Sequence, residues 1–197
     1  MKLLIATRNR HKFDEIRAIL APYGVQATDL REHPEAPEVV EDGATFEANA
    51  ILKAVTLARA TGFWTLADDS GLEVDALNGE PGVRSARYAG EPSDDAANNC
   101  KLLATLGARP DRRARFRCAL ALADPAGPVR TVSGACPGVI LLAPRGQHGF
   151  GYDPLFVPDG FELTFAELDA ATKNRISHRA QALQRAVSEW REVLALH

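Results

Sequence analysis

The chain opens with a short apolar run, a polar loop and an amphipathic segment, and this order constrains its fold more than any other feature. Residues 3–6 are all apolar and lie between polar neighbours, which is typical of a buried strand. Apolar residues then recur at helical spacing from Phe13 to Leu20, and Pro-Tyr-Gly at 22–24 predicts the end of that helix. A buried strand that leads through a polar loop into a helix indicates an α/β fold.

Later segments continue this alternation of helices and strands. One expected helix runs from Phe46 to Gly62, a second from the N-cap Ser93 to Gly107, and a third from Leu183 to Leu194. A capping box at Thr164-Phe165-Ala166-Glu167 predicts the start of a further helix. The expected strands are 64–67, 116–122 and 129–142, of which the last two form a pair in a second lobe. The acidic, proline-bearing residues 29–44 predict a loop, and the Gly- and Pro-rich residues 77–92 predict an ordered, non-helical surface segment.

These elements predict an α/β fold in which two lobes surround one long mixed sheet, with a central substrate cleft. The chain has 197 residues, which is enough to bury a sizeable core. We find no internal repeat and no low-complexity linker in the sequence. We therefore expect one domain over residues 1–197, built from two lobes without a separable linker.

The charge of the chain excludes several classes of partner. Apolar residues make up 46% of the sequence and charged residues 25%, and the formal net charge is −3. Such a chain has no broad positive field that would attract nucleic acid or an anionic membrane. A polyanionic substrate must therefore meet a local cluster of cations.

The cysteines and the first residues bear on the compartment. Cys100, Cys118 and Cys136 are widely spaced and form no Cys-x-x-Cys pair, so we expect free buried thiols instead of a zinc or redox site. The apolar run at 3–6 is shorter than the ~7–15 residues of a signal-peptide core, and no segment approaches the length of a membrane span. We expect a cytoplasmic protein.

The polar loop after the first strand is a candidate phosphate site. Its sequence is Thr7-Arg8-Asn9-Arg10-His11-Lys12. Backbone N–H groups and the dipole at the start of a helix favour anions, and the basic side chains add positive charge. Basic and polar residues are also common at solvated helix starts, so the loop by itself leaves both interpretations open.

Two adjacent aspartates follow the apolar run at 64–67. In open α/β sheets, ligand chemistry lies at the carboxyl ends of the strands, which makes Asp68-Asp69-Ser70-Gly71 a candidate catalytic motif. Neighbouring side chains leave a strand on opposite faces, so we expect Asp68 and Asp69 to have different roles. An Asx-turn without catalytic function is the alternative.

The acidic loop supplies further oxygen ligands through Glu41 and Asp42. Magnesium usually takes one or two protein carboxylates, and water and substrate phosphates complete its octahedron. Glu41 and Asp69 would satisfy that requirement. A solvated acidic loop remains the alternative interpretation.

Two motifs in the second half are candidates for recognition of a base. In Gly149-Phe150-Gly151-Tyr152-Asp153-Pro154, glycines flank an aromatic residue, so that the backbone can approach a flat ligand on which Phe150 or Tyr152 could stack. Ser177-His178-Arg179 opens the last helix and offers donors to carbonyl oxygens. A β-turn with core aromatics and an exposed helix start are the corresponding alternatives.

In their order along the chain, these motifs resemble the inosine/xanthosine triphosphate pyrophosphatase family. The matching blocks extend from residue 3 to about 185. They are Thr7-x-Asn9-x-x-Lys12, Glu41, Asn49-Ala50-Ile51-Leu52-Lys53-Ala54, Ala67-Asp68-Asp69-Ser70-Gly71-Leu72, Gly82-Val83-Arg84-Ser85-Ala86-Arg87-Tyr88-Ala89-Gly90, Gly149-Phe150-Gly151-Tyr152-Asp153-Pro154 and Ser177-His178-Arg179.

The resemblance implies a homodimeric, Mg²⁺-dependent enzyme that hydrolyses ITP, dITP and XTP to the monophosphate and pyrophosphate and so removes them from the nucleotide pool. It implies that Asp69 is the catalytic base and, with Glu41, a metal ligand. The residues implied to hold the triphosphate are Thr7, Arg8, Asn9, Arg10, His11, Lys12, Lys53 and Ser70. Those implied to form the base pocket are Phe150, Gly151, Tyr152, Asp153, Lys173, His178 and Arg179.

The chain departs from the family pattern at one position. The family usually has Phe-x-Glu-Asn-Ala, whereas the corresponding residues here are Phe46-Glu47-Ala48-Asn49-Ala50. If the family glutamate shapes the metal site, Glu41, Glu47 or a water must replace it.

Other functions are compatible with the residues taken one motif at a time. A non-catalytic purine nucleotide sensor would use the same cleft, and a phosphatase would release orthophosphate in place of pyrophosphate. The lack of a Gly-x₄-Gly-Lys-Ser/Thr motif in the sequence argues against a P-loop NTPase. The net charge disfavours nucleic-acid binding.

Overall fold

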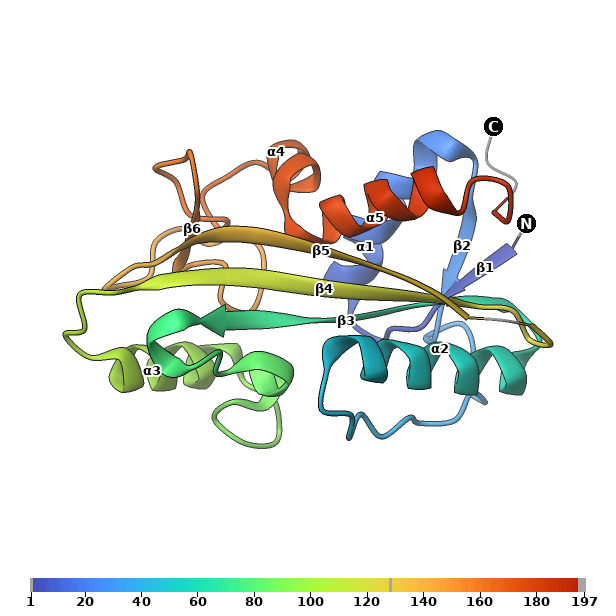
Figure 1. Ribbon diagram of the computed structural model, residues 1–197, viewed down its shortest axis with the longest axis horizontal. Coiled ribbons are helices and arrows are strands. Elements are labelled where there is room, and N and C mark those ends of the chain that lie inside the picture. Colours follow the sequence, from blue (N-terminus) through green and yellow to red (C-terminus); the bar gives the residue numbers. More distant parts are fainter. Residues whose placement is uncertain (1, 128, 195–197) are drawn as a thin grey trace. The chain divides into compact units, whose positions relative to one another are not determined.

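A mixed sheet runs through the computed structural model, which describes residues 2–127 and 129–194 (Figure 1). Within this part of the chain, six strands pair in the order β2-β1-β3-β4-β5-β6. They are β1 (Lys2–Ile5), β2 (Gln26–Asp29), β3 (Trp64–Val74), β4 (Arg113–Ala123), β5 (Val129–Ile140) and β6 (Phe156–Pro158). β1 is parallel to both β2 and β3, whereas β5 and β6 are antiparallel, so the predicted α/β class with a mixed sheet is confirmed.

The chain divides into two compact units. Unit 1 comprises Met1–Asp69, Cys118–Gly134 and Arg179–His197, and unit 2 comprises Ser70–Arg117 and Ala135–His178. The chain passes between the units within β3, β4 and β5, and again between His178 and Arg179. The pairing of 116–122 with 129–142 is therefore confirmed, but their assignment to a second lobe alone is wrong, because β4 and β5 each contribute residues to both units.

Unit 1 is a layered α/β structure. Its helices α1 (Arg10–Leu20) and α5 (His178–Glu189) lie on one side of the sheet, and α2 (Phe46–Thr61) lies on the other (Figure 1). Apolar side chains from α1, α5 and the strands share one core, to which Ile16, Leu120 and Leu183 contribute fully buried side chains. The loop from the end of β1 to the start of α1 lies at the carboxyl end of a parallel strand, where open sheets place their ligand sites.

Unit 2 has a separate, aromatic core. It contains α3 (Asp95–Leu106), α4 (Ala170–Ile176) and the 3₁₀ helices η2 (Asp75–Leu77) and η3 (Gly82–Arg87). The rings of Phe116, Phe156 and Phe165 lie with centroids 4.7 to 5.8 Å apart. Contacts at these distances stabilise a core beyond the burial of apolar area.

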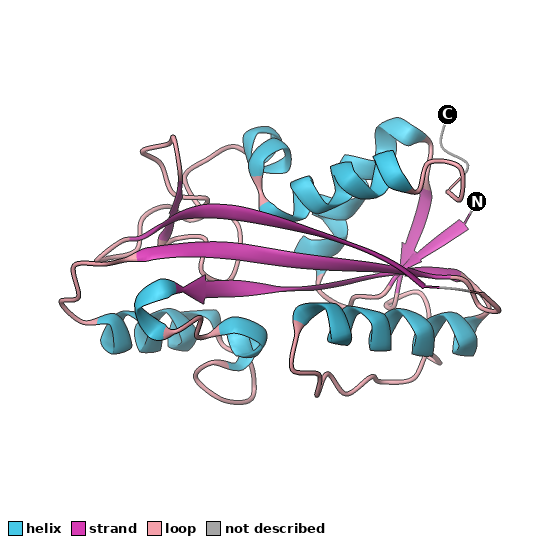
Figure 2. Ribbon diagram, viewed as in Figure 1, coloured by secondary structure: helices cyan, strands magenta, loops and turns pink. Residues whose placement is uncertain are grey.

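Several local predictions agree with the structure. α1 ends at a 3₁₀ turn that contains Pro22, and Gly62 ends α2 with a positive φ of 72°. Residues 30–45 form loops and turns, as expected for the acidic segment (Figure 2). Each of the described helices is too short or too polar to cross a membrane.

Other local predictions are wrong. Asp94, and not Ser93, is the N-cap of α3, because its carboxylate accepts from the N–H of Ala97. Glu167 does return to the N–H of Thr164, as in a capping box, but residues 164–168 form a turn and α4 begins only after Asp169. The segment 77–92 contains the helix η3, although it was expected to be non-helical.

Two strand assignments also differ from the prediction. β2 was not anticipated, because four residues that end in Thr28 and Asp29 carry little strand signal by themselves. The aspartate motif lies inside the 11-residue strand β3, not beyond its end. The strand continues because Leu72 and Val74 are buried in the core of unit 2 and the aspartates find polar partners.

We expect Gly71→Ala to destabilise the protein. An added Cβ would lie 2.4 Å from Ser85 Oγ and 2.6 Å from the carbonyl oxygen of Gly82, so the backbone of η3 would have to move. Overpacking of this kind costs about 1–3 kcal/mol, which urea unfolding would measure. Gly127→Ala is the matched control, because its Cβ would meet the Asp124 side chain at 3.0 Å or more. Equal stabilities of the two variants would contradict this account of Gly71.

Candidate functional site

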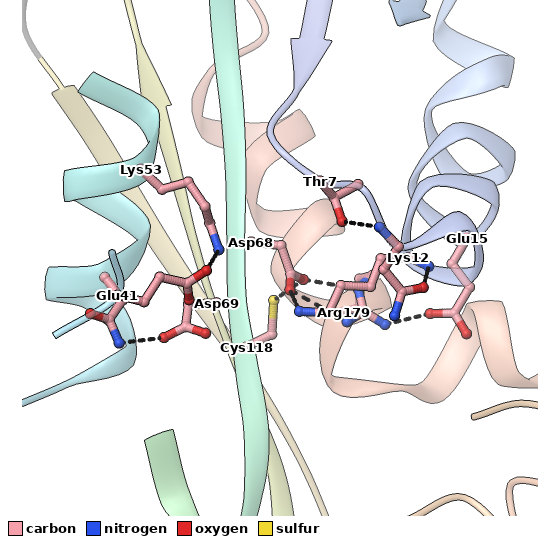
Figure 3. A network of polar contacts seen from close by, with 11 residues as sticks. Thr7, Lys12, Glu15, Glu41, Lys53, Asp68, Asp69, Cys118 and Arg179 are labelled. Carbon is pink, nitrogen blue, oxygen red and sulfur yellow. Dashed lines mark hydrogen bonds and ion pairs between the residues drawn. The ribbon is translucent and has the colours of Figure 1, made fainter. Parts of the chain in front are cut away.

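The two adjacent aspartates of β3 point to opposite sides of the strand (Figure 3). Asp68 faces Lys12 and Arg179, whereas Asp69 faces Asn49. Both carboxylates are almost completely buried, with 3% and 7% of each residue exposed. The expectation that the alternation of the strand separates their contacts is confirmed.

Asp68 is the centre of a buried ionic cluster within unit 1. Its carboxylate accepts from Lys12 Nζ at 2.7 Å and from Arg179 Nε at 2.9 Å. The Cys118 thiol donates to the same carboxylate, with Sγ 3.1 Å from Oδ2. Arg179 also pairs with Glu15, which lies on α1 one turn after Lys12 (Figure 3).

Mutual pairing keeps Asp68 and Lys12 charged within this cluster. Burial would raise the pKa of Asp68, but Arg179 and Lys12 overcome this effect and hold that pKa well below its usual value. Burial would lower the pKa of Lys12, yet the neighbouring Asp68 carboxylate raises it overall. Burial and the Asp68 carboxylate raise the pKa of the Cys118 thiol well above its usual value, so this thiol stays protonated.

The loop between β1 and α1 is closed by two local hydrogen bonds. Thr7 Oγ1 accepts from the N–H of Asn9, and Asn9 Oδ1 accepts from the N–H of Lys12. Asn9 is therefore the N-cap of α1. The side chains of Arg8, Arg10 and His11 are exposed, and Arg8 and Lys12 extend from the same short turn. This arrangement presents several cations beside the start of a helix.

On the other face of β3, Asn49 holds the Asp69 carboxylate. Asn49 Nδ2 donates to Asp69 Oδ2 at 3.0 Å, while its Oδ1 accepts from the N–H of Gly43 at 2.7 Å. Lys53, one turn further along α2, forms a 2.9 Å ion pair with Glu41. Asn49 and Lys53 thus use the same face of α2 to bring the acidic loop and Asp69 together. Lys53, Glu41 and Asp69 lie on one side of β3 in Figure 3.

The surroundings of Asp69 favour a carboxylate that accepts protons near neutral pH. Burial raises its pKa to about 6, with a further increase from Glu41, although Lys53, Lys12 and Asn49 act in the opposite direction. A general base works best when its pKa lies near the operating pH. Lys12 pairs with Asp68, the residue directly before Asp69, and its charge lowers the pKa of Asp69 although the two side chains lie on different sides of β3.

Glu41 and Asp69 are also the donors that a divalent cation would need. Two carboxylates that repel each other beside a loop of cations form an oxygen-only set, which suits a hard cation such as Mg²⁺. Within residues 2–127 and 129–194, no group of three or more His, Cys, Asp and Glu side chains is arranged to hold a metal. Two carboxylates match the number that Mg²⁺ usually takes from a protein, with substrate oxygens and water as its other ligands.

In unit 2, the predicted base-binding residues form a second group. The N–H of Phe150 donates to Asp153 Oδ2, and Lys173 Nζ donates to the same oxygen at 2.6 Å. The Lys173 ammonium lies 4.9 Å from the centroid of the Phe150 ring. The Gly149–Asp153 loop thus combines a half-buried aromatic face with a buried cation and a buried carboxylate.

Tyr152 and His178 are core residues of unit 2. Tyr152 is 3% exposed, and its hydroxyl donates to the carbonyl oxygen of Ser85 at 2.9 Å. His178 stacks on Phe116, with ring centroids 4.8 Å apart and an interplanar angle of 13°. The Tyr152 side chain is therefore part of this core, whereas Phe150 is half-buried.

The predicted site residues are divided between the two units. Those in unit 1 are Thr7, Arg8, Asn9, Arg10, His11, Lys12, Glu41, Lys53, Asp69 and Arg179. Those in unit 2 are Ser70, Phe150, Gly151, Tyr152, Asp153, Lys173 and His178. Arg179 was predicted with the base pocket, but its observed partners are Asp68 and Glu15 of unit 1.

Sequence reasoning missed three residues of this site. Asn49 was quoted only as part of a motif, although its spacing of four from Lys53 places both on one helix face. Glu15 stands three residues after Lys12, which is also a detectable helical spacing. Cys118 gave no signal, because its contact with Asp68 spans 50 residues.

Comparisons with known proteins show which family the chain resembles. Residues 3–189 match the model of the Ham1 family. A dITP/XTP pyrophosphatase from Desulforamulus reducens is 54% identical over 189 residues, which cover 95% of this chain and 94% of the relative.

Solved structures support the same relationship. A HAM1 protein from Coxiella burnetii is 40% identical and superposes with a TM-score of 0.88 over 98% of this chain and 99% of its own. A nucleoside-triphosphatase, a dITP/XTP pyrophosphatase from Mycobacterium abscessus, is 47% identical with a TM-score of 0.76 over 94% and 97% of the two chains. The sequence match, the shared fold and the order of the motifs lead to one conclusion: the chain belongs to the Ham1 family.

Proposed function

We propose that this protein hydrolyses non-canonical purine nucleoside triphosphates, namely ITP, dITP and XTP, to the monophosphate and pyrophosphate. The observation that carries the proposal is the position of Lys12, which pairs at 2.7 Å with Asp68, directly before Asp69, whose carboxyl group has a pKa raised by burial to about 6. Such a cation and base can neutralise a phosphate chain and activate water at one place. The relatives named dITP/XTP pyrophosphatase support the choice of substrate.

The proposed chemistry is an in-line attack of water on the α-phosphorus. Asp69 orients the water and accepts its proton, while the hydrogen bond from Asn49 to Oδ2 holds the carboxylate in place. Lys12 and Lys53, with donors from Thr7 and Asn9, stabilise the charge on the departing pyrophosphate. Catalysis then consists mainly of positioning and charge neutralisation of a loose transition state.

Glu41 and Asp69 would hold Mg²⁺, which supplies additional neutralisation of phosphate charge when it is bound. The loop also presents exposed nitrogen-bearing side chains to the phosphates, those of Arg8, Arg10 and His11. Ser70 follows directly after the catalytic base Asp69. We further propose that the enzyme acts in the cytoplasm as a homodimer. A membrane or a nucleic acid has no role in this reaction.

Recognition of the base is assigned to the second group of residues. Phe150 offers the stacking face, and Gly151, Tyr152, Asp153 and Lys173 shape and charge its loop. A donor from His178 to O6 would accept hypoxanthine and xanthine but would oppose the 6-amino group of adenine. A buried donor that faces another donor discriminates by about 10⁴ or more, far beyond a difference of shape.

We expect the purified protein to release pyrophosphate from ITP, dITP and XTP in the presence of Mg²⁺ and to act far more weakly on ATP and GTP. A panel of eight nucleoside triphosphates, with and without Mg²⁺, tests this by separate assays of pyrophosphate and orthophosphate. Binding of ITP without any product would favour a non-catalytic sensor. Release of orthophosphate alone would point to a phosphatase.

We expect Asp69→Asn to lose activity and gain stability. Loss of a general base costs about 10²–10⁴ in kcat. The folded pKa of about 6 lies above the usual 3.8, so an ionised Asp69 opposes folding. Below pH 3.8 the carboxyl group is protonated in both states and the cost vanishes. Between pH 3.8 and pH 6, ionisation of Asp69 lowers the free energy of unfolding progressively, and above pH 6 this loss is constant at about 3 kcal/mol at most.

Urea unfolding in EDTA from pH 3.5 to pH 8 measures this dependence. The stability of Asp69→Asn relative to wild type should increase across the interval between pH 4 and pH 6. Asp159→Asn is the control, because Asp159 is exposed and its replacement should have no such effect. Near-wild-type turnover of Asp69→Asn would rule out the role of Asp69 as base.

We expect Lys12→Met to lower kcat/KM for ITP by about 10² or more, because one positive charge on the transferred phosphates is lost. The variant should also bind pyrophosphate more weakly as a competitive inhibitor. Arg17→Met changes an exposed cation of the same helix α1 and is the matched control. If both variants retain wild-type inhibition by pyrophosphate, Lys12 does not contact the phosphates.

A further inference from the structure

The Gly149–Asp153 loop is a tight turn whose backbone is fixed by its own residues. The N–H of Phe150 donates to Asp153 Oδ2, and the N–H of Asp153 donates back to the carbonyl oxygen of Phe150. Gly149 and Gly151 have φ of 77° and 60°, which favour glycine. A Cβ at Gly149 would also lie 2.1 Å from Asp153 Oδ2. These contacts close the turn, but they leave its orientation within unit 2 to other residues.

Helix α3 holds this turn at both polar groups of the Gly151 residue. Asp95 Oδ2 accepts from the N–H of Gly151 at 2.7 Å. Asn99 Nδ2 donates to the carbonyl oxygen of Gly151 at 2.8 Å. Asp95 and Asn99 are four residues apart, so both project from one face of α3. Both the N–H and the carbonyl group of Gly151, the residue after Phe150, are therefore hydrogen-bonded to side chains of α3.

In the described part of the chain, the side-chain oxygen of Asn99 is left without a hydrogen bond when its nitrogen binds Gly151, which lowers the stability of the folded protein. Asn99 Oδ1 is buried and has no hydrogen-bond partner among the described residues. Rotation of the amide by 180° would place that oxygen against the carbonyl of Gly151, so the contact with Gly151 fixes the observed orientation. An apolar side chain would fill this place without an unpaired acceptor. Because a buried polar group without a partner destabilises the fold, we expect a function to explain why asparagine stands at this position.

Phe150 and Asp153 are the groups of this turn that the proposed function assigns to the base. The Phe150 ring lies against the Lys173 ammonium, and Asp153 receives the hydrogen bond of that ammonium. Rotation of the turn about its ends would move the ring and the carboxylate together. The two hydrogen bonds from α3 to Gly151 oppose such a rotation.

We propose that Asp95 and Asn99 are positioning residues for recognition of the purine base, an inference that rests on the proposed function. They touch neither the phosphates nor the water, and they act through Gly151 on the ring of Phe150. Their loss should therefore weaken binding of the base and leave binding of the phosphates unchanged.

Two product ligands separate the two halves of the substrate. IMP carries the base with a single phosphate, and pyrophosphate carries no base, so calorimetric titration of the full chain with each ligand in Mg²⁺ reports them separately. The informative variants are Asp95→Ala and Asn99→Leu, because the leucine has a similar shape and also removes the unpaired acceptor. Asp95→Asn keeps an acceptor oxygen for Gly151 and is the conservative rescue.

Each of the two variants should bind IMP about five-fold more weakly, as expected for the loss of one hydrogen bond, and should bind pyrophosphate as the wild type does. KM for ITP should rise by a similar factor, with little change in kcat. Asp95→Asn should recover wild-type affinity. Asp94→Ala is the matched control, because it removes the N-cap of the same helix without touching the turn.

The possible outcomes separate this inference from the proposed function. Wild-type affinity for IMP in Asp95→Ala and Asn99→Leu would overturn the inference and leave the proposed function intact. Parallel loss of IMP and pyrophosphate, or equal loss in Asp94→Ala, would also overturn it, because the residues would then serve only the stability of unit 2. A wild-type protein that binds pyrophosphate but not IMP would contradict the proposed base site itself.

Discussion

The ion cluster around Asp68 is the interaction on which the arrangement of unit 1 depends. It joins three elements that are distant in sequence, since Asp68 is 56 residues from Lys12 and 111 from Arg179. A buried carboxylate is tolerated only when cations and hydrogen-bond donors surround it, and removal of one partner from such a pair typically costs about 3–5 kcal/mol. The cluster therefore fixes α1 and the start of α5 against β3. Because Lys12 belongs to it, the same contacts place a cation at the end of the loop that follows β1.

The contrast between Asp68 and Asp69 shows how one strand supports two chemical states. Both carboxylates are buried, and burial raises the pKa of each. Asp68 has two cations in direct contact, so its pKa falls well below the usual value and it remains a fixed negative charge. At Asp69, burial outweighs the charges of Lys53 and Lys12 and the hydrogen bond from Asn49, so its pKa is about 6. The alternation of a β-strand is sufficient to separate a structural anion from a candidate base.

The parts of this structure that the sequence could predict are those with a local signal. Periodicity and capping residues predicted α1 and α2, and alternation predicted the central parts of β4 and β5. The opposite orientation of Asp68 and Asp69 followed from the geometry of a strand alone. By contrast, β3 extends beyond the predicted run because its polar residues are neutralised by Lys12, Arg179 and Asn49, which are distant in the chain. The place of Arg179 could not be predicted for the same reason, because the motif Ser177-His178-Arg179 contains no information about Asp68.

The replacement of the family glutamate by Ala48 is explained by the geometry of α2. Asn49 and Lys53 define the face of the helix that serves Asp69 and Glu41. Glu47 is two residues before Asn49 and so points to another side of the helix, where it accepts a hydrogen bond from the Thr131 hydroxyl at 2.8 Å. The neighbouring glutamate therefore does not substitute for the missing one. An added Cβ on Gly43 would lie 3.1 Å from the Ala48 Cβ and 2.5 Å from Asn49 Oδ1, so the acidic loop packs closely on this part of α2. In this chain, the small residues at 43 and 48 permit this close packing, and the acidic loop is joined to the same helix by the 2.9 Å ion pair between Glu41 and Lys53.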